Sequence, residues 1–259
     1  MPQADIVIRE CVTVAELDSC VRLQREVFGL PDLEISPRRH LIVSRQAGGW
    51  TLGAFVEERL VGFVHHLTAI RDAEIFGYSH MMAVDPDFQN RGVGAQLKWS
   101  QRDRAIQEGR NFIKWTWDPM QARNAHFNLN RLGVTVSNYA VNFYGTDYPT
   151  SPLPSRDNPD GIDSDRLFAN WQLESPRVVG LASGISAEPV LIKPSAMIEI
   201  PTNWSSLCRE SPSQARQEQL RVRGEFQQAL AAGLIVAGFE RSSEQPRYLL
   251  YPGEVLRSL

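Results

Sequence analysis

Residues 81–95 read MMAVDPDFQNRGVGA, an apolar run followed by a turn and two closely spaced glycines. The apolar residues predict the end of a β-strand, Asp85-Pro86-Asp87 predicts a turn, and we expect a helix over about 93–108. Backbone N–H groups in the first turn of a helix have no partner within it and attract anions. Gly92 and Gly94 lack the Cβ atoms that would keep an anion away. The stretch therefore predicts a phosphate site, and the alternative is a plain turn.

Two common phosphate-binding motifs fit this stretch poorly. A Walker loop needs Lys and then Ser or Thr after its second glycine, but Ala95 and Gln96 follow Gly94. A dinucleotide-binding fingerprint needs a third glycine where Leu97 stands, and it belongs on the first strand of a domain. Several predicted elements precede this segment, so another class of phosphate ligand is favoured.

The flanking sequence places the segment in a strand–helix–strand crossover. Phe76–Val84 and Phe112–Trp117 are rich in apolar and aromatic residues, and Gly109 ends the helix between them. Such a crossover makes its two strands run parallel. Upstream, Thr13-Val14-Ala15-Glu16 has the spacing of a capping box at a helix start. Further elements are two antiparallel strands at 50–56 and 60–70, and a helix over about 122–132.

The predicted fold class is α+β, with a mixed sheet, a central parallel strand pair and flanking helices, followed by a smaller α+β C-terminal extension. The division falls where prolines interrupt regular structure, at Pro149, Pro152, Pro154 and Pro159. We expect the main domain over 1–148, a connecting loop over 149–166 and the extension over 167–259.

Composition excludes several classes of function. Lys and Arg number 27 against 30 Asp and Glu, a net charge of −3, which disfavours a general binder of nucleic acids or anionic membranes. The odd set Cys11, Cys20 and Cys208 fits a reducing, cytoplasmic setting. Neither a signal peptide nor an apolar run of about 20 residues is visible. No nucleic-acid or membrane partner is expected, and homo-oligomerisation is left open.

The central segment resembles motif A of the GNAT superfamily of acyl-CoA-dependent N-acyltransferases. That motif is Gln or Arg, any two residues, Gly, any residue, then Gly or Ala, and Gln89, Gly92 and Gly94 match it. The order of predicted elements also matches, so the resemblance covers roughly residues 4–145. Asp118-Pro119, Asn124-Ala125, Phe127-Asn128 and Leu132-Gly133 look like a little-characterised branch of predicted GNAT acyltransferases that carry a C-terminal extension.

The resemblance implies acetyl-CoA or another acyl-CoA as co-substrate. The pantetheine arm would pair with a strand edge, and one backbone amide near Met82 or Ala83 would donate to the thioester oxygen. Asn124 would contact the arm, or else cap the helix beside it. The implied coenzyme-binding residues are Met82, Ala83, Val84, Gln89, Asn90, Arg91, Gly92, Val93, Gly94, Ala95 and Asn124.

Acyl transfer needs a neutral amine, so a general base would help. His80 is the candidate because it lies on the strand leading to the site, although a structural histidine in a half-buried sheet explains it equally well. Many family members carry a Tyr acid where counting places Leu129, so Tyr144 or a water would protonate the leaving thiolate. The adjacent His65 and His66 point to opposite faces of a strand, and we expect no metal.

The sequence therefore predicts an N-acyltransferase that moves an acetyl or other short acyl group, with succinyl as one option, to a primary amine. A small, amino-acid-like acceptor and direct attack in a ternary complex are expected, because no cysteine lies in the motif segment to serve as a nucleophile. The alternative is a non-catalytic module that binds or senses acyl-CoA. Lys98 and Arg102, four residues apart, fit an exposed helix face.

Overall fold

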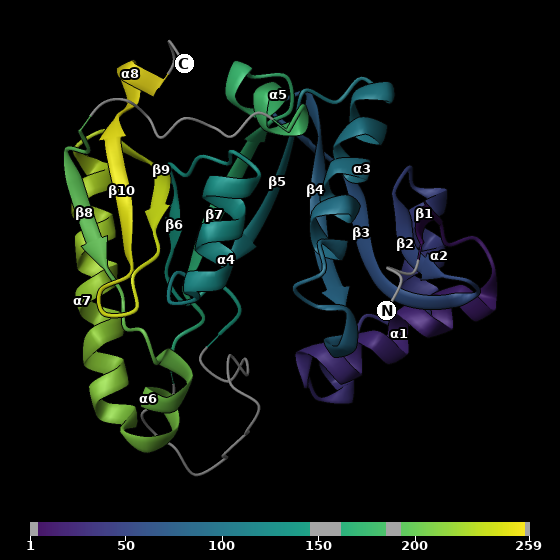
Figure 1. Cartoon of the computed structure of the whole chain (residues 1–259), viewed down its shortest axis with the longest axis horizontal. Coiled ribbons are helices and arrows are strands. Elements are labelled where there is room, and N and C mark those ends of the chain that lie inside the picture. Colours follow the sequence, from purple (N-terminus) through teal and green to yellow (C-terminus); the bar gives the residue numbers. More distant parts are fainter. Residues whose placement is uncertain (1–4, 146–161, 185–192, 257–259) are drawn as a thin grey trace. The chain divides into compact units, whose positions relative to one another are not determined.

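The computed structural model describes residues 5–145, 162–184 and 193–256 (Figure 1). The chain forms two compact units, Met1–Lys114 and Trp115–Leu259, and the division falls within strand β5 (Phe112–Trp117). Among the described residues, none of the helices is both long enough and apolar enough to cross a membrane.

The first unit is built on a mixed sheet with the strand order β1-β2-β3-β4-β5. Neighbouring strands are antiparallel except for β4 and β5, which are parallel and pair at Gly77↔Ile113 and Tyr78↔Lys114. The crossover between β4 and β5 is a single helix, which requires this parallel arrangement. The other strands are β1 (Ile6–Glu10), β2 (Trp50–Val56), β3 (Arg59–Arg71) and β4 (Glu74–Val84).

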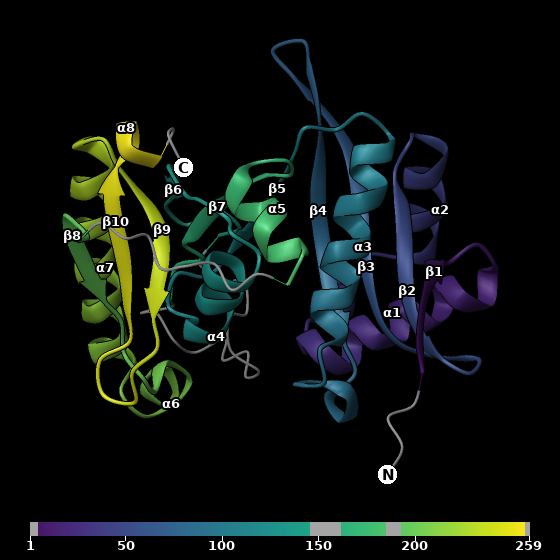
Figure 2. The ribbon, with the colours of Figure 1, turned by 45° about the horizontal axis from the view of Figure 1, so that its top comes forward.

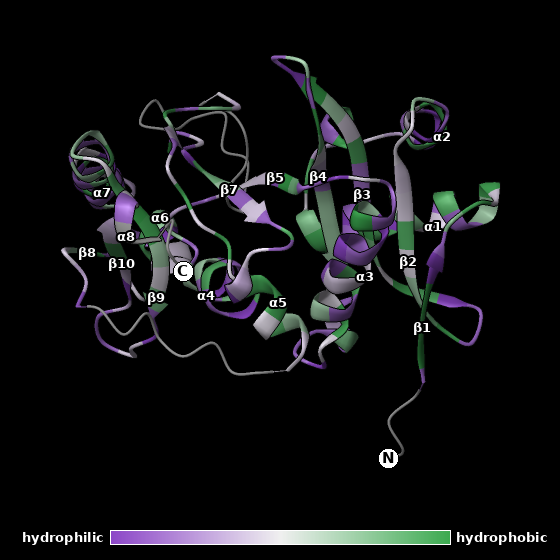
Figure 3. Cartoon of the chain, turned by 90° about the horizontal axis from the view of Figure 1, so that it is seen from above, coloured by the Kyte–Doolittle hydropathy of each residue, from purple (hydrophilic) through white to green (hydrophobic). Residues whose placement is uncertain are grey.

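Helices cover both faces of this sheet (Figures 1 and 2). Helices α1 (Val14–Phe28) and α2 (Arg38–Gln46) pack on one face, and α3 (Val93–Gln107) packs on the other. Short 3-10 turns lie at Asp32–Glu34 and Pro86–Phe88. The hydropathy colours of Figure 3 show hydrophobic and hydrophilic residues mixed along α3, as expected of a helix with one buried side.

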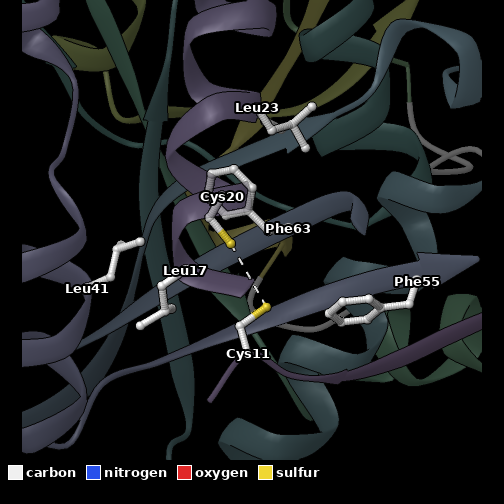
Figure 4. Close-up of a cluster of buried hydrophobic side chains, with 8 residues drawn as sticks. Cys11, Leu17, Cys20, Leu23, Leu41, Phe55 and Phe63 are labelled. Carbon is white, nitrogen blue, oxygen red and sulfur yellow. Dashed lines mark hydrogen bonds between the residues drawn. The ribbon is translucent and has the colours of Figure 1, made fainter. Parts of the chain in front are cut away.

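Each face of the sheet has its own apolar core. Between α3 and the sheet lie Trp50 and Val64 from the strands and Leu97 from the helix itself. Beneath α1 and α2, the sulfurs of Cys11 and Cys20 face each other across 3.9 Å (Figure 4). That separation belongs to two free thiols, since a disulfide bond is about 2.05 Å long. The remaining buried members of this second core are Leu17, Leu23, Leu41, Phe55, Phe63 and Ala83.

The predicted capping box is present at the start of α1. The Thr13 hydroxyl accepts from the Glu16 N–H at 3.2 Å, and the Glu16 carboxylate accepts from the Thr13 N–H at 2.9 Å. Gly29, in the left-handed region with φ of 61°, ends the helix.

A β-bulge interrupts β4 at His80. On β3, His65 lies opposite Met81 and His66 lies opposite Ser79, so His80 is an extra residue between them. Bulges of this kind re-aim a side chain relative to the alternating pattern of the strand. Here the bulge places His80 on the same side of the sheet as His65, with their ring centroids 5.9 Å apart.

The second unit contains a three-stranded antiparallel sheet with the order β8-β10-β9, against which α7 packs. The helix that begins at α4 (Ala122–His126) continues as a π-helical turn, Phe127–Arg131. The other elements are β6 (Tyr139–Ala140), β7 (Arg166–Gln172), α5 (Pro176–Ala182), β8 (Ala196–Glu199), α6 (Trp204–Glu210), α7 (Pro212–Ala231), β9 (Leu234–Glu240), β10 (Arg247–Pro252) and α8 (Gly253–Leu256).

The predicted fold class, a mixed sheet with a parallel pair and flanking helices followed by a smaller C-terminal sheet, is confirmed. The connecting loop expected over 149–166 stays a prediction, because 149–161 lies outside the described residues. By their internal contacts, residues 115–145 group with the C-terminal part of the chain. The reason is strand pairing, because Tyr139 of β6 pairs with Leu167 of β7 and Val136 bridges to Val236. These contacts hold residues 115–145 to the C-terminal part of the chain.

Candidate functional site

The loop between β4 and α3 presents free backbone N–H groups. The first hydrogen bond of α3 runs from the Gln96 N–H to the Gly92 carbonyl at 3.0 Å. The N–H groups of residues 93–95 precede it and have no partner within the helix. Gly92 is the N-cap residue, with φ of 84°, and no side chain caps this end. The preceding Asn90 is also left-handed, with φ of 60°. The predicted anion-binding geometry is therefore present.

Space and charge around the loop favour an anion. A Cβ atom at Gly92 would meet nothing within 4 Å, so the loop is open to solvent on that side. Asn90 and Arg91 are exposed, and the Arg91 guanidinium lies 5.4 Å from the centre of the Phe88 ring. A cation beside free amides adds to the attraction for a phosphate.

Gln89 braces the loop from within the protein. Its side-chain amide donates to the Val84 carbonyl at 3.0 Å and thereby ties the end of β4 to the segment that leads into α3. The matched glutamine of the motif thus positions the loop.

The end of β4 offers backbone groups to a ligand. Met82, Ala83 and Val84 pair with β3 on one side. Within the described pairing of the first unit, β4 meets β5 only at Gly77 and Tyr78. The opposite edge of residues 82–84 therefore takes no strand partner in this unit, and an extended amide-containing ligand can pair with it.

His80 lies just before this edge and is exposed. Partial desolvation by the surrounding protein, and then the charge of His40, lower its pKa from the usual value of 6.5. The imidazole is therefore neutral at pH 7, with a lone pair available to accept a proton. The rings of His40 and His65 lie 5.5 Å and 5.9 Å from the His80 ring.

This histidine cluster was not anticipated. The prediction that His65 and His66 lie on opposite faces is confirmed. His66 stacks on Trp50 of the neighbouring strand, on the face that α3 covers, with ring centroids 4.1 Å apart. The contribution of His40 from α2, however, depends on how that helix packs, and no local pattern in the sequence carries this information.

The expectation for Lys98 is wrong. Its side chain is buried, with an exposed fraction of 2%, and its ammonium group donates to Ser79 Oγ at 3.1 Å and to Gln101 Oε1 at 2.7 Å. Burial lowers the pKa of Lys98 well below its usual range. Lys98 lies on the side of α3 that faces the sheet, so the charge pattern that indicated an exposed face was misleading.

Asn124 and Tyr144 belong to the second unit. Asn124 is exposed within α4, whose N-cap is Gln121, so it does not cap that helix. Tyr144 is 46% exposed, and its hydroxyl lies 3.4 Å from Thr116 Oγ1. Leu129, at the position where a Tyr acid is expected, is fully buried in the π-helical turn and serves the core.

Comparison with known proteins gives a consistent result. A model of the acetyltransferase (GNAT) family matches residues 17–134. The ribosomal-protein-S18-alanine N-acetyltransferase from Escherichia coli shares the fold with a TM-score of 0.51 and 14% identity, over 66% of this chain and 96% of its own. A putative GNAT-family acetyltransferase from Desulfovibrio desulfuricans has a TM-score of 0.52 and 15% sequence identity. The match covers 65% of this chain and 99% of that protein. No curated protein sequence matches the chain.

A parallel strand pair, an open strand edge and an uncapped glycine-rich helix start together define the class of acyl-CoA-dependent N-acyltransferases. The matched region contains all three features. Residues 17–134 match the acetyltransferase (GNAT) family and form a domain of that kind.

Proposed function

We propose that this chain transfers an acetyl or other short acyl group, with succinyl among the candidates, from acyl-CoA to the primary amine of a small, amino-acid-like acceptor. The observation that carries the proposal is the free N-terminus of α3 beside the open edge of β4. The first feature suits a pyrophosphate and the second suits the amides of a pantetheine arm.

The proposed roles follow the order of the chain. The amides of residues 90–95, together with Arg91, hold the pyrophosphate, and Gln89 keeps this loop in place. The backbone of residues 82–84 pairs with the arm, and an amide of Met82 or Ala83 donates to the thioester oxygen as it gains negative charge. The likeness to the family alone is what supports Asn124 as a further polar contact to the arm.

The proposed reaction is a direct transfer. The amine nitrogen of the acceptor attacks the thioester carbon, the new C–N bond forms and the C–S bond breaks. His80 accepts the proton that the amine must lose, and Tyr144 or a water supplies a proton to the departing thiolate. A thiol has a pKa near 8.5, so this last proton contributes less than the base.

The coenzyme loop is tested by the substitution Gly92→Val, with Gly109→Val as its matched control. Both glycines are left-handed, with φ of 84° and 74°, and a Cβ would meet nothing within 4 Å at either. Gly92 begins α3, whereas Gly109 lies beyond its end. We expect Gly92→Val to weaken acetyl-CoA binding by roughly tenfold or more in calorimetry, and Gly109→Val to leave binding unchanged. Equal affinities in the two variants would remove the loop assignment.

The base is tested by His80→Gln, with His126→Gln as a control from the second unit. We expect His80→Gln to lower kcat/KM by about 10² to 10⁴ while acetyl-CoA affinity is retained. The measurement is thiol release with several acyl-CoAs and a panel of amino acids. An unchanged rate in the His80 variant would assign the proton transfer to another group.

A second candidate function is a non-catalytic module that binds acyl-CoA. The burial of Leu129 where an acid is expected favours it. Coenzyme binding without thiol release on any amine of the panel would support this candidate, whereas release that depends on one amine supports the enzyme.

A further inference from the structure

Three histidines from separate elements of the first unit converge on one point. They are His40 of α2, His65 of β3 and His80 of β4, and each offers a ring nitrogen within 4.8 Å of the others. The ring centroid of His40 lies 5.5 Å from the ring centroid of His65 and 5.5 Å from that of His80. All three pairs meet edge-on, with interplanar angles of 60° to 76°. Three ring nitrogens this close to one another, from three separate elements, could bind one ion together.

The fold brings this arrangement about in two steps. Because His65 faces α2 while His66 faces α3, only His65 is directed to this side of the sheet. The bulge in β4 then turns His80 toward the same side. His40, in the first turn of α2, completes the group.

Two of the three histidines hold nitrogen atoms that lack a protein partner. In the part of the chain that the structure describes, the Nε2 atoms of His40 and His65 are buried and make no hydrogen bond. Buried polar atoms are nearly always paired, so two such atoms on neighbouring rings of one cluster point to a missing ligand. The other nitrogen of His65 is held by Thr51, whose Oγ1 lies 2.8 Å from Nδ1. Metal-bound histidines usually have such a partner on the second nitrogen, because it fixes the ring orientation.

We propose that His40, His65 and His80 bind one divalent transition-metal ion, with Zn²⁺ as the probe of this class. With Zn–N bonds of about 2.0–2.1 Å, three imidazoles on a tetrahedral ion have centroids roughly 5 to 6 Å apart, which is the spacing found here. An all-imidazole set suits Zn²⁺, Cu²⁺, Ni²⁺ and Co²⁺ and disfavours Mg²⁺ and Ca²⁺, which prefer oxygen.

The three histidines differ in exposure, which gives an ion access to the cluster from the surface. His65 is buried, His40 is half-buried and His80 is exposed, so the group opens from the sheet to the surface. Three protein ligands also leave a fourth position for water or another small ligand. The earlier expectation of no metal considered only neighbouring residues in the sequence, where His65 and His66 cannot share an ion.

One consequence rests on the proposed function. An ion held by His80 occupies the lone pair that would accept the proton of the amine, so Zn²⁺ should inhibit acyl transfer over the concentration range in which it binds. Metal binding and acyl transfer are measured separately, so that either can fail without the other.

The experiment uses the full chain without a histidine tag, freed of metal by a chelator. Titration with Zn²⁺ in a calorimeter should give one ion per chain, and Co²⁺ should give the visible absorption of a histidine-bound ion. His40→Gln, at a half-buried position on a helix, should weaken binding by about tenfold or more, as should His65→Gln. Thr51→Val should weaken it by about tenfold through the lost partner of His65. His126→Gln, which removes a histidine from the second unit, should leave it unchanged.

Circular dichroism of each variant distinguishes lost binding from lost folding, and His40→Gln keeps the test decisive if His65→Gln does not fold. The proposal is overturned if Zn²⁺ and Co²⁺ do not bind, or if they bind equally well to folded His40→Gln. Binding that leaves acyl transfer unaffected supports the metal site and overturns the role of His80 as base. Acyl transfer without metal binding overturns the metal site alone.

Discussion

Glu16 shows how one carboxylate secures a helix start. It accepts hydrogen bonds from the N–H groups of Val12 and Thr13, both at 2.9 Å, and pairs with Arg9. Burial acts to raise its pKa, but these bonds outweigh burial and lower the pKa of Glu16 from 4.5 to about 2. The charged form is therefore the one that stabilises the fold.

We expect Glu16→Gln to lower the free energy of unfolding by about 1 kcal/mol at pH 7, because an amide replaces these charge-assisted bonds poorly. The folded-state pKa lies below the unfolded value, so the stabilisation is full above about pH 4.5 and is lost as the pH falls toward 2. Thermal unfolding at pH 7 and pH 3 should show the two proteins converging in acid. Glu26→Gln, at an exposed position of the same helix, should match the wild type at both pH values, and a pH-independent gap for Glu16→Gln would contradict the account.

The burial of Lys98 could not be predicted from the sequence. Together with Leu97 and Gln101 it lies on the buried side of α3, where Ser79 and Gln101 satisfy its nitrogen. The sequence indicated only that Lys98 and Arg102 are four residues apart, which is typical of an exposed face. Which side of an amphipathic helix a lysine joins depends on the partners that the sheet supplies, and those partners are distant in sequence.

At the scale of elements, the contiguous part of the site was predictable. The capping box at Thr13, the strand ending at Val84 and the helix opening at Gly92 each depend on neighbouring residues, and the structure contains all three. The family motif lies within one such local segment, which is why the geometry of the loop could be predicted from the sequence.

The bulge in β4 was not predictable in the same way. In a regular strand, every second residue along 76–84 lies on the same face of the sheet. The extra residue at His80 interrupts this alternation, so the faces of the residues on its two sides no longer follow from one pattern. The meeting of His40 with His65 and His80 required the position of α2 as well. Local patterns therefore predicted the glycine-opened start of α3 and missed the histidine cluster.

At the scale of the whole molecule, the second unit contains its own buried ionic cluster. Arg223 of α7 donates to Asp163 at 2.6 Å and to Asp165 at 2.9 Å and 3.0 Å. The Tyr139 hydroxyl also donates to Asp165 at 2.6 Å. The cluster thus ties β6 and the segment before β7 to α7. A partner removed from such a cluster leaves a buried charge without compensation.

We expect Arg223→Met to lower the free energy of unfolding by about 3 kcal/mol or more, because two carboxylates lose their main partner. The matched control is Arg221→Met, two residues earlier on the same helix. Arg221 pairs with Glu218 and Glu225 at a more exposed position, where such pairs contribute about 0–1 kcal/mol. Denaturant unfolding at pH 7 measures both variants, and similar losses would show that burial of the cluster is not what matters.

The order of strands in the second sheet has a consequence for synthesis on the ribosome. Strand β10 lies between β8 and β9, yet it follows both of them in the chain. The backbone N–H and C=O groups of β8 and β9 that pair with β10 therefore stay unpaired until residues 247–252 have left the exit tunnel. A nascent chain that stalls before that point would present two unmatched strand edges, the kind of surface that chaperones cover.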